Sequence, residues 1–350
     1  ATINKFSADS GLVIIMNVKT GEILSSSSYP DFDPNNRKTF NENNLFNRSI
    51  QANYEMGSTF KPLTVAMGIE KNLIKPDMYF DVSKPIKNTI HDYHPHKGTY
   101  NIKEIIVNSS NIGSAKMAEI IGKKNQQEFF KKIGFTEKID IQLLEAAKPM
   151  GNTYNWGPIE TMTIGYGHGY AITPLHLIAA YSIISNNGKK VKPKIFLDDK
   201  DLIYTEQIIS PETSKYILSL LRAVVTETKF TGSQIKINGY EIAGKTGTAD
   251  LIKNGNYEQN ANLTSFLGVF PISEPKYAVL AIIENPKKTK KIKKLTGATV
   301  STPLVKKIIL RMIEILNLPR IINEEILNAA TTINNNNKNV INWSWKKYRM

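Results

Sequence analysis

The chain has 350 residues, of which 41% are hydrophobic, enough for a sizeable core in one large domain or two smaller ones. It contains no cysteine, so disulfides are excluded, and its formal net charge of +14 favours anionic partners: nucleic acid, acidic lipid or an acidic cell wall. No apolar run approaches the roughly 18–20 residues of a membrane-spanning helix and no signal peptide opens the sequence, so we expect either a complete soluble protein or a fragment without its anchor.

The elements predicted in chain order begin with a hairpin, whose strands at 12–16 and 22–28 flank a turn at 19–21. A polar loop leads to a helix over 58–72, and helical patterns broken by glycine fill 102–190. The later elements are an amphipathic helix after Pro211, strand-like runs at 239–251, 263–270 and 277–285, and a closing helix over 303–316. Strands at both ends with helices between them predict one sheet built from distant segments.

The stretch GYEIAGKTGTAD at 239–250 permits two interpretations. Gly239, Gly244, Lys245 and Thr246 fit the spacing of a phosphate-binding loop, which must follow a strand and open a helix. The residues after Thr246 contain two glycines and no helical apolar period, so we disfavour nucleotide binding. The same letters contain K-T-G, a motif of serine acyl-transfer sites.

The companion motifs of K-T-G are short, so their order and placement decide between copies. S-x-x-K begins at four serines, but only Ser58 opens a predicted helix, where free amides stabilise negative charge and Lys61 shares its face. For S-x-N, Ser109–Asn111 leads into a helix, whereas the copy at 185–187 lies in a turn. The ordered set is Ser58 with Lys61, Ser109 with Asn111, and then Lys245, Thr246 and Gly247.

With these motifs in order, the sequence resembles the penicillin-binding transpeptidases, specifically the class B, division-type enzymes of Gram-negative bacteria. The resemblance spans about residues 9–318 and includes NRSIQANYEMGSTFKP, SSNIGSAKMAE, IGYGHGYAITPLHLIAAYSIISNNG and AGKTGTA. Met56 stands where proline is common, His176 stands where glutamine is usual, and residues 139–147 lack the expected glycines. These departures concern local loop shape and remove no reacting group.

The resemblance implies a mixed α/β (α+β) fold with a central antiparallel sheet of about five strands flanked by helices and a mostly helical subdomain. The transpeptidase domain is then expected over 1–320, with its sheet parts at about 9–57 and 206–318 and its helical part at about 58–205. The Asn-rich tail, 321–350, is expected to be disordered. The family's membrane anchor and pedestal domain are absent from this sequence.

The resemblance also implies acyl transfer through a covalent intermediate, in which Ser58 attacks the penultimate D-Ala carbonyl of a peptidoglycan stem peptide. Lys61 is the candidate base, and burial beside Lys245 would lower its pKa toward neutrality. Ser109 would relay a proton, and Asn111 would bond Lys61 and the substrate amide. The substrate carboxylate would meet Lys245, Thr246, Gly247 and Thr248, and the backbone amides of Ser58 and Thr248 would form an oxyanion hole.

The implied setting is the periplasmic face of the bacterial inner membrane. The implied partners are stem peptides or the lipid-linked precursor, β-lactams, a septal glycan polymerase and other division proteins, and no cofactor is expected. The alternatives that remain are a D,D-carboxypeptidase or β-lactamase-like hydrolase and a non-catalytic scaffold.

Two further clusters permit functional interpretations that we disfavour. His91, His94 and His96 resemble a metal site, but their proline-containing loop predicts no fixed geometry. Six lysines at 287–294 could bind nucleic acid, but no aromatic residues interleave with them, so a solvated loop suited to an anionic wall or membrane surface is favoured.

Overall fold

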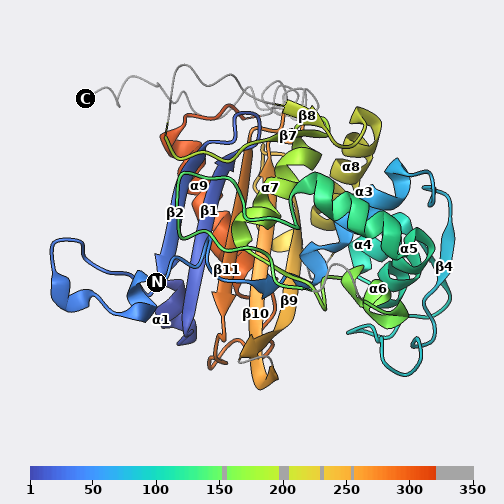
Figure 1. Ribbon diagram of the computed structural model, residues 1–350, viewed down its shortest axis with the longest axis horizontal. Coiled ribbons are helices and arrows are strands. Elements are labelled where there is room, and N and C mark those ends of the chain that lie inside the picture. Colours follow the sequence, from blue (N-terminus) through green and yellow to red (C-terminus); the bar gives the residue numbers. More distant parts are fainter. Residues whose placement is uncertain (152–155, 197–204, 229–231, 254–255, 321–350) are drawn as a thin grey trace, which may run out of the picture.

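The computed structural model describes residues 1–151, 156–196, 205–228, 232–253 and 256–320. Five strands, Ser10–Asn17 (β1), Ile23–Tyr29 (β2), Ala243–Lys253 (β9), Asn256–Phe270 (β10) and Tyr277–Glu284 (β11), form one sheet in the order β2-β1-β11-β10-β9. Every neighbouring pair in this sheet is antiparallel. The predicted central sheet, made from the two ends of the chain, is therefore confirmed (Figure 1).

The helices of the described residues divide between the sheet and a separate helical region (Figure 1). The α-helices are Thr2–Phe6 (α1), Glu42–Leu45 (α2), Lys61–Glu70 (α3), Ile102–Asn108 (α4), Asn111–Ile133 (α5, with non-helical angles at Gly122), Pro158–Ile164 (α6), Pro174–Ser185 (α7), Pro211–Glu227 (α8) and Ser301–Ile315 (α9). The 3-10 turns are Arg37–Thr39 (η1), Gly57–Thr59 (η2) and Ser233–Ile235 (η3). Short two-stranded sheets pair Tyr54–Glu55 (β3) with Ala171–Ile172 (β6), Tyr79–Asp81 (β4) with Thr99–Asn101 (β5), and Lys189–Val191 (β7) with Thr205–Gln207 (β8).

The middle strand, β11, explains how the two faces of the sheet are covered. Its first seven residues are buried, and alternate side chains enter different hydrophobic clusters, as the two-residue period of a strand requires. Leu280 and Ile282 join the large cluster shared with α3, α7 and α8, whereas Val279 and Ala281 pack with Val305 and other residues of α9. The edge strand β2 instead carries a run of exposed serines, which suits a solvated edge.

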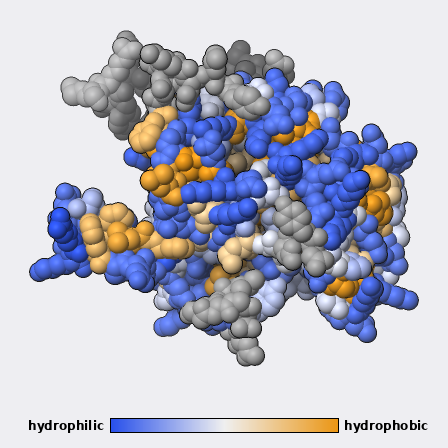
Figure 2. Space-filling model, in the orientation of Figure 1, coloured by the Kyte–Doolittle hydropathy of each residue, from blue (hydrophilic) through white to orange (hydrophobic). Residues whose placement is uncertain are grey.

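The surface is largely hydrophilic in the view of Figure 2. An apolar patch lies on the segment between β2 and β3, which extends away from the sheet in Figure 1 and exposes Phe40, Leu45 and Phe46. None of the helices in the described ranges combines the length and apolar character that crossing a bilayer requires. The predicted tail at 321–350 lies outside the described residues.

Candidate active site

The nucleophile candidate lies just before the helix that was predicted to contain it. Ser58 occupies the middle of η2, and α3 begins at Lys61. Gly57 has a φ of +52°, which an α-helix does not tolerate. The turn is closed by the Phe60 amide, which donates to the Gly57 carbonyl at 2.9 Å. Residues three apart eclipse in a 3-10 turn, so Ser58 and Lys61 share a face. Ser58 is half-buried, and its hydroxyl makes no hydrogen bond within the described part of the chain.

Two segments distant in sequence and one local hydrogen bond anchor this turn. The buried Tyr181 hydroxyl on α7 donates to the Thr59 carbonyl at 2.7 Å. Thr59 in turn donates its hydroxyl to the Met56 carbonyl at 2.7 Å, and the Gly57 amide donates to the Gly167 carbonyl at 3.1 Å. A buried carbonyl satisfied by a buried phenol fixes the backbone around the Ser58 position.

The Ser109 hydroxyl lies between the two lysines. Lys61 Nζ donates to Ser109 Oγ at 3.1 Å and also to the Ser109 carbonyl, while Lys245 Nζ on β9 donates to the same Oγ at 2.9 Å. Both lysines are 0% exposed. The fold therefore joins members of all three sequence motifs, although no hydrogen bond links Lys61 to Ser58. Catalytic hydrogen bonds are often long before substrate binds, so this gap does not remove Lys61 as the base.

The surroundings of the two lysines lower the pKa of each side chain. Burial, reinforced by the charge of Lys245, holds the pKa of Lys61 well below its usual value, while the Asp92 carboxylate opposes the shift. Burial lowers the pKa of Lys245 to about 7. The predicted direction for Lys61 and both of its predicted causes are confirmed. The lowered pKa of Lys61 favours its neutral amine, the form that can accept a proton.

The second motif is placed by a backbone conformation that non-glycine residues seldom adopt. Ser109 ends α4 with φ 60° and ψ 41°, in the left-handed region. The next residue, Ser110, caps α5: its hydroxyl oxygen accepts from the Gly113 amide at 2.9 Å. The Asn111 side chain donates its amide to the His91 carbonyl at 2.9 Å rather than contacting Lys61. The expected bond between Asn111 and Lys61 is thus absent from the hydrogen bonds of the described residues, and a carbonyl in the loop before α4 accepts from Asn111 instead.

The third motif runs along β9, an edge strand that faces the η2 turn. A Cβ at Gly247 would lie 2.2 Å from Ser265 Oγ and 3.0 Å from the Thr59 methyl, and one at Gly57 would lie 2.9 Å from the Thr248 carbonyl. Both positions need glycine for β9 and the turn to approach this closely. Thr246 is buried, whereas Thr248 is exposed and its hydroxyl accepts from the Gly297 amide at 3.1 Å. The Thr248 hydroxyl proton remains available to a ligand.

The structure also tests the phosphate-binding loop and the metal site that the sequence disfavoured, and it places the lysine-rich run. Gly244, Lys245 and Thr246 lie within a strand that continues to Lys253, so the helix that a phosphate-binding loop requires does not follow. Among the described residues, no group of three His, Asp or Glu side chains is placed to hold a metal ion. The six lysines at 287–294 are exposed and form none of the salt bridges found in the described ranges.

Two buried polar groups near the site were missed by the sequence analysis. Asp92 lies among the histidines that were considered as a metal site. No sequence pattern around it indicates that its carboxylate reaches the start of α5. Tyr181 lies in a mostly apolar helix, where its sequence context indicates only a buried core side chain. Only the fold reveals that each one bonds a segment distant in sequence.

Comparison with known proteins identifies the family and the fold. The family model described as penicillin binding protein transpeptidase domain matches residues 11–310. The chain belongs to this family. Among curated relatives of this transpeptidase family, it is 31% identical over 334 residues to a probable peptidoglycan D,D-transpeptidase FtsI of Caulobacter vibrioides, covering 90% of this chain and 56% of that protein. It is 33% identical over 320 residues to stage V sporulation protein D of Bacillus subtilis, covering 86% and 48%. The chain thus spans about half the length of these relatives.

Solved structures agree with the family assignment. The transpeptidase domain of penicillin-binding protein 3 from Burkholderia pseudomallei superposes with a TM-score of 0.80 at 25% identity, covering 92% of this chain and 93% of that one. Penicillin-binding protein 3 of Mycobacterium tuberculosis, solved in complex with aztreonam, has the same fold with a TM-score of 0.82 at 23% identity, covering 91% of this chain and 75% of that one. The penicillin-binding transpeptidase fold predicted from the motifs is confirmed.

Proposed function

We propose that this chain is a serine D,D-transpeptidase that cross-links peptidoglycan stem peptides through an acyl-enzyme on Ser58. The observation that carries the proposal is the Ser109 hydroxyl, bonded by the buried amines of Lys61 and Lys245 beside the Ser58 turn. A buried lysine with a lowered pKa, one turn from a serine, supplies the base that a hydroxyl nucleophile needs. The names of the curated relatives support the same reaction.

In the acylation half-reaction, the Ser58 oxygen attacks the carbonyl of the penultimate D-Ala, and Lys61 accepts the hydroxyl proton. The bond to the terminal D-Ala then breaks, and the proton reaches the departing amine through the Ser109 hydroxyl, which Lys61 already bonds at 3.1 Å. An ester on Ser58 and a free D-Ala result. The base works only in its neutral form, so the low pKa of Lys61 is a requirement of this step.

Substrate would bind along the free edge of β9. Its terminal carboxylate is assigned to the Lys245 ammonium with the hydroxyls of Thr246 and Thr248, and the absence of a side chain at Gly247 lets the peptide approach the strand. The backbone amides of Ser58 and Thr248 are assigned to the oxyanion hole, where losing one donor typically costs ~3 kcal/mol. Asn111 is assigned to the substrate amide, after exchanging its bond to the His91 carbonyl.

In the second half-reaction, an amine from a neighbouring stem peptide attacks the Ser58 ester. As the new amide bond forms, Lys61 takes a proton from the attacking nitrogen, the ester bond breaks, and Lys61 passes the proton to the departing Ser58 oxygen. Attack by water instead would make the chain a carboxypeptidase, and rapid hydrolysis of a penicilloyl ester would make it a β-lactamase. The acceptor therefore decides between the leading function and its nearest alternatives.

The setting that we propose follows from the relatives. Division-type transpeptidases act at the periplasmic face of the inner membrane with a septal glycan polymerase, on stem peptides presented by the wall or its lipid-linked precursor. β-Lactams would acylate Ser58 because they mimic the acyl donor, and a structural neighbour was solved with aztreonam. The net charge of +14 suits the anionic wall.

A donor stem peptide ending in D-Ala-D-Ala, incubated with and without a D-amino acid acceptor, tests this proposal. We expect D-Ala release and an exchanged or cross-linked product with the unmodified chain, and neither with Ser58→Ala. Release of D-Ala with no amine-containing product at any acceptor concentration would instead establish a carboxypeptidase. The absence of both products, with no labelling by fluorescent penicillin, would point to a scaffold.

A further inference from the structure

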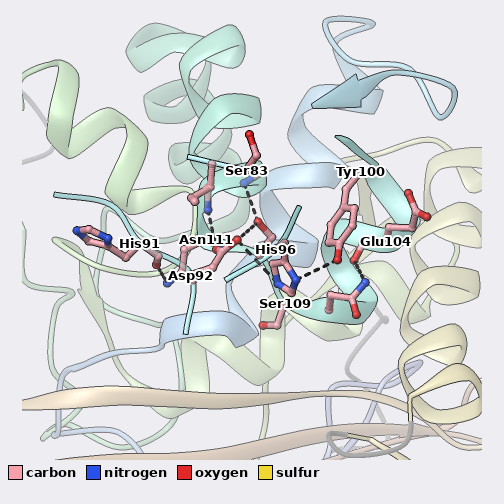
Figure 3. Close-up of polar contacts among 12 residues, drawn as sticks. Ser83, His91, Asp92, His96, Tyr100, Glu104, Ser109 and Asn111 are labelled. Carbon is pink, nitrogen blue, oxygen red and sulfur yellow. Dashed lines mark hydrogen bonds and ion pairs between the residues drawn. The ribbon is translucent and has the colours of Figure 1, made fainter. Parts of the chain in front are cut away.

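A buried carboxylate outside the three motifs lies at the start of α5, beside the motif Ser109–Asn111. Asp92 Oδ1 accepts from the backbone amides of Asn111 and Ile112, the latter at 3.0 Å, and Oδ2 accepts from the Ser110 hydroxyl at 2.7 Å. The side chain is 2% exposed. Figure 3 shows Asp92 among Asn111, His91 and His96, with Ser109 nearby. One carboxylate thus receives three hydrogen bonds from consecutive residues of the second motif.

Side chains of both segments take part in the contact between the second motif and the loop that contains Asp92. The Ser110 hydroxyl that donates to Asp92 also accepts from Gly113, and the Asn111 side chain donates to the carbonyl of His91, next to Asp92. Carboxylates that receive several amide bonds at a helix start are held strongly, because the helix dipole adds to each bond. The orientation of the Asn111 side chain and the left-handed backbone at Ser109 are therefore fixed from this loop.

Further contacts of His96 connect this loop to Asp92 and to β5, the strand that leads into α4. His96 Nε2 lies 3.9 Å from Asp92 Oδ2, and His96 Nδ1 shares a 2.9 Å hydrogen bond with the Tyr100 hydroxyl on β5. From β5 the chain enters α4, which ends at Ser109 and turns into α5. The Asp92 carboxylate therefore links the beginning of the segment from Asp92 to Asn111 to its end.

The same carboxylate acts on Lys61. The groups that face the Lys61 amine with charge are Lys245 from β9, Asp92 and His96 from the loop before α4, and His168 from the loop after α6. Of these, Asp92 is the group whose charge raises the pKa of Lys61, against burial and Lys245. The pKa of His96 is itself lowered, chiefly by burial, which disfavours the charged form of this ring.

We propose that Asp92 is a positioning residue for acyl transfer: it fixes the Ser109–Asn111 turn against Lys61 and supplies a negative charge to the surroundings of that amine. This inference rests on the proposed function of Ser58 and Lys61. It assigns to the loop before α4 a role in both the geometry and the charge of the site.

Two substitutions separate the geometric role from the electrostatic one. Asp92→Asn keeps an oxygen for the two backbone amides and places an amide donor opposite the Ser110 hydroxyl, so it removes the charge and keeps most bonds. Asp92→Ala removes the charge and the bonds together. The matched control is Asp81→Asn, an exposed aspartate of β4 whose carboxylate accepts from the Ser83 amide and hydroxyl within its own turn.

The experiment measures the rate of acylation by fluorescent penicillin from pH 5 to pH 9 for the unmodified chain and the three variants. Losing the negative charge makes Lys61 easier to deprotonate, so Asp92→Asn should move the acid limb of the profile to lower pH by roughly half a unit or more. Its plateau should stay within about tenfold of the unmodified rate, whereas Asp92→Ala should fall at least about tenfold further because buried bonds are lost. Asp81→Asn should match the unmodified profile.

The folded fraction of each variant is measured by circular dichroism at every pH, and the acylation rate is divided by it, so a partly unfolded variant still reports on the limb. A limb that stays in place in Asp92→Asn, or a plateau that is equal in the two Asp92 variants, would overturn the inference while leaving the transpeptidase proposal intact. If the unmodified chain takes up no penicillin, both proposals fall.

Discussion

The substitution Lys245→Gln removes a buried positive charge while keeping a donor for the Ser109 hydroxyl. Lys245 Nζ donates to Ser109 Oγ at 2.9 Å and lies within the environment that lowers the pKa of Lys61. Glutamine can reach the same oxygen with its amide, so the change mainly removes charge. The structure therefore predicts two separable effects, one on substrate affinity and one on the pH dependence of acylation.

The first effect follows from the carboxylate that β-lactams and stem peptides share. A hydrogen bond between charged partners contributes about 1.5–3 kcal/mol, which corresponds to a roughly 10- to 150-fold fall in the second-order rate of acylation. The second effect has a definite sign. Because the charge of Lys245 helps to lower the pKa of Lys61, its removal raises that pKa, and the acid limb should move to higher pH by about one unit.

Acylation by fluorescent penicillin, followed from pH 5 to pH 9, measures both effects in one series. The control is Lys215→Gln, which neutralises an exposed lysine on α8 and should change neither the rate nor the limb. The predicted displacement is opposite in direction to that of Asp92→Asn. A Lys245→Gln profile that keeps the unmodified rate to within threefold, or whose limb moves to lower pH, would refute the assigned roles of the two lysines.

Two further predictions concern stability. Tyr181→Phe leaves the buried Thr59 carbonyl without its 2.7 Å partner, so the free energy of unfolding should fall by about 1–3 kcal/mol and the melting temperature by roughly 1–4 °C. Tyr79→Phe, at an exposed site, should change neither, and equal melting curves for the two variants would contradict this account of the turn. Burial lowers the pKa of His176 from 6.5 to about 4, and its ring bonds Thr173 Oγ1 at 2.7 Å and the Glu137 carbonyl at 3.0 Å. The unfolded chain therefore binds the extra proton, and stability that is fully present above about pH 6.5 should decline by up to ~3 kcal/mol as the pH falls to 4, then stay level below. His176→Gln should flatten this slope in denaturant unfolding measured at each pH, and an unchanged slope would exclude His176 as its source.

Periodicity predicted most of the fold because the strongest patterns lie where burial is most complete. The run at 277–285 reads as a strand because β11 is the middle strand and both of its faces are covered. The start of α3 was misplaced by three residues, since Gly57–Thr59 form a 3-10 turn that packs close to β9. A tertiary contact of this kind leaves no period in the letters.

The site divides in the same way. Lys61, Ser109 and Lys245 could be predicted to meet because short motifs in order restrict the chemistry, and their hydrogen bonds join them. The bond from Asn111 to His91 could not be predicted, because a side-chain amide takes whichever acceptor the fold brings nearest. Asp92 was hidden for a related reason: its partners are backbone amides, which have no sequence signature.

The central claim is that Ser58, among the four serines that open S-x-x-K in this sequence, forms the covalent acyl intermediate. Intact-mass and peptide-mapping measurements after incubation with benzylpenicillin test it directly. The account predicts one penicilloyl group per chain, carried by the peptide that contains Ser58 and absent from Ser58→Ala. A stoichiometric adduct on Ser233, Ser273 or Ser344, or an adduct that survives in Ser58→Ala, would contradict it.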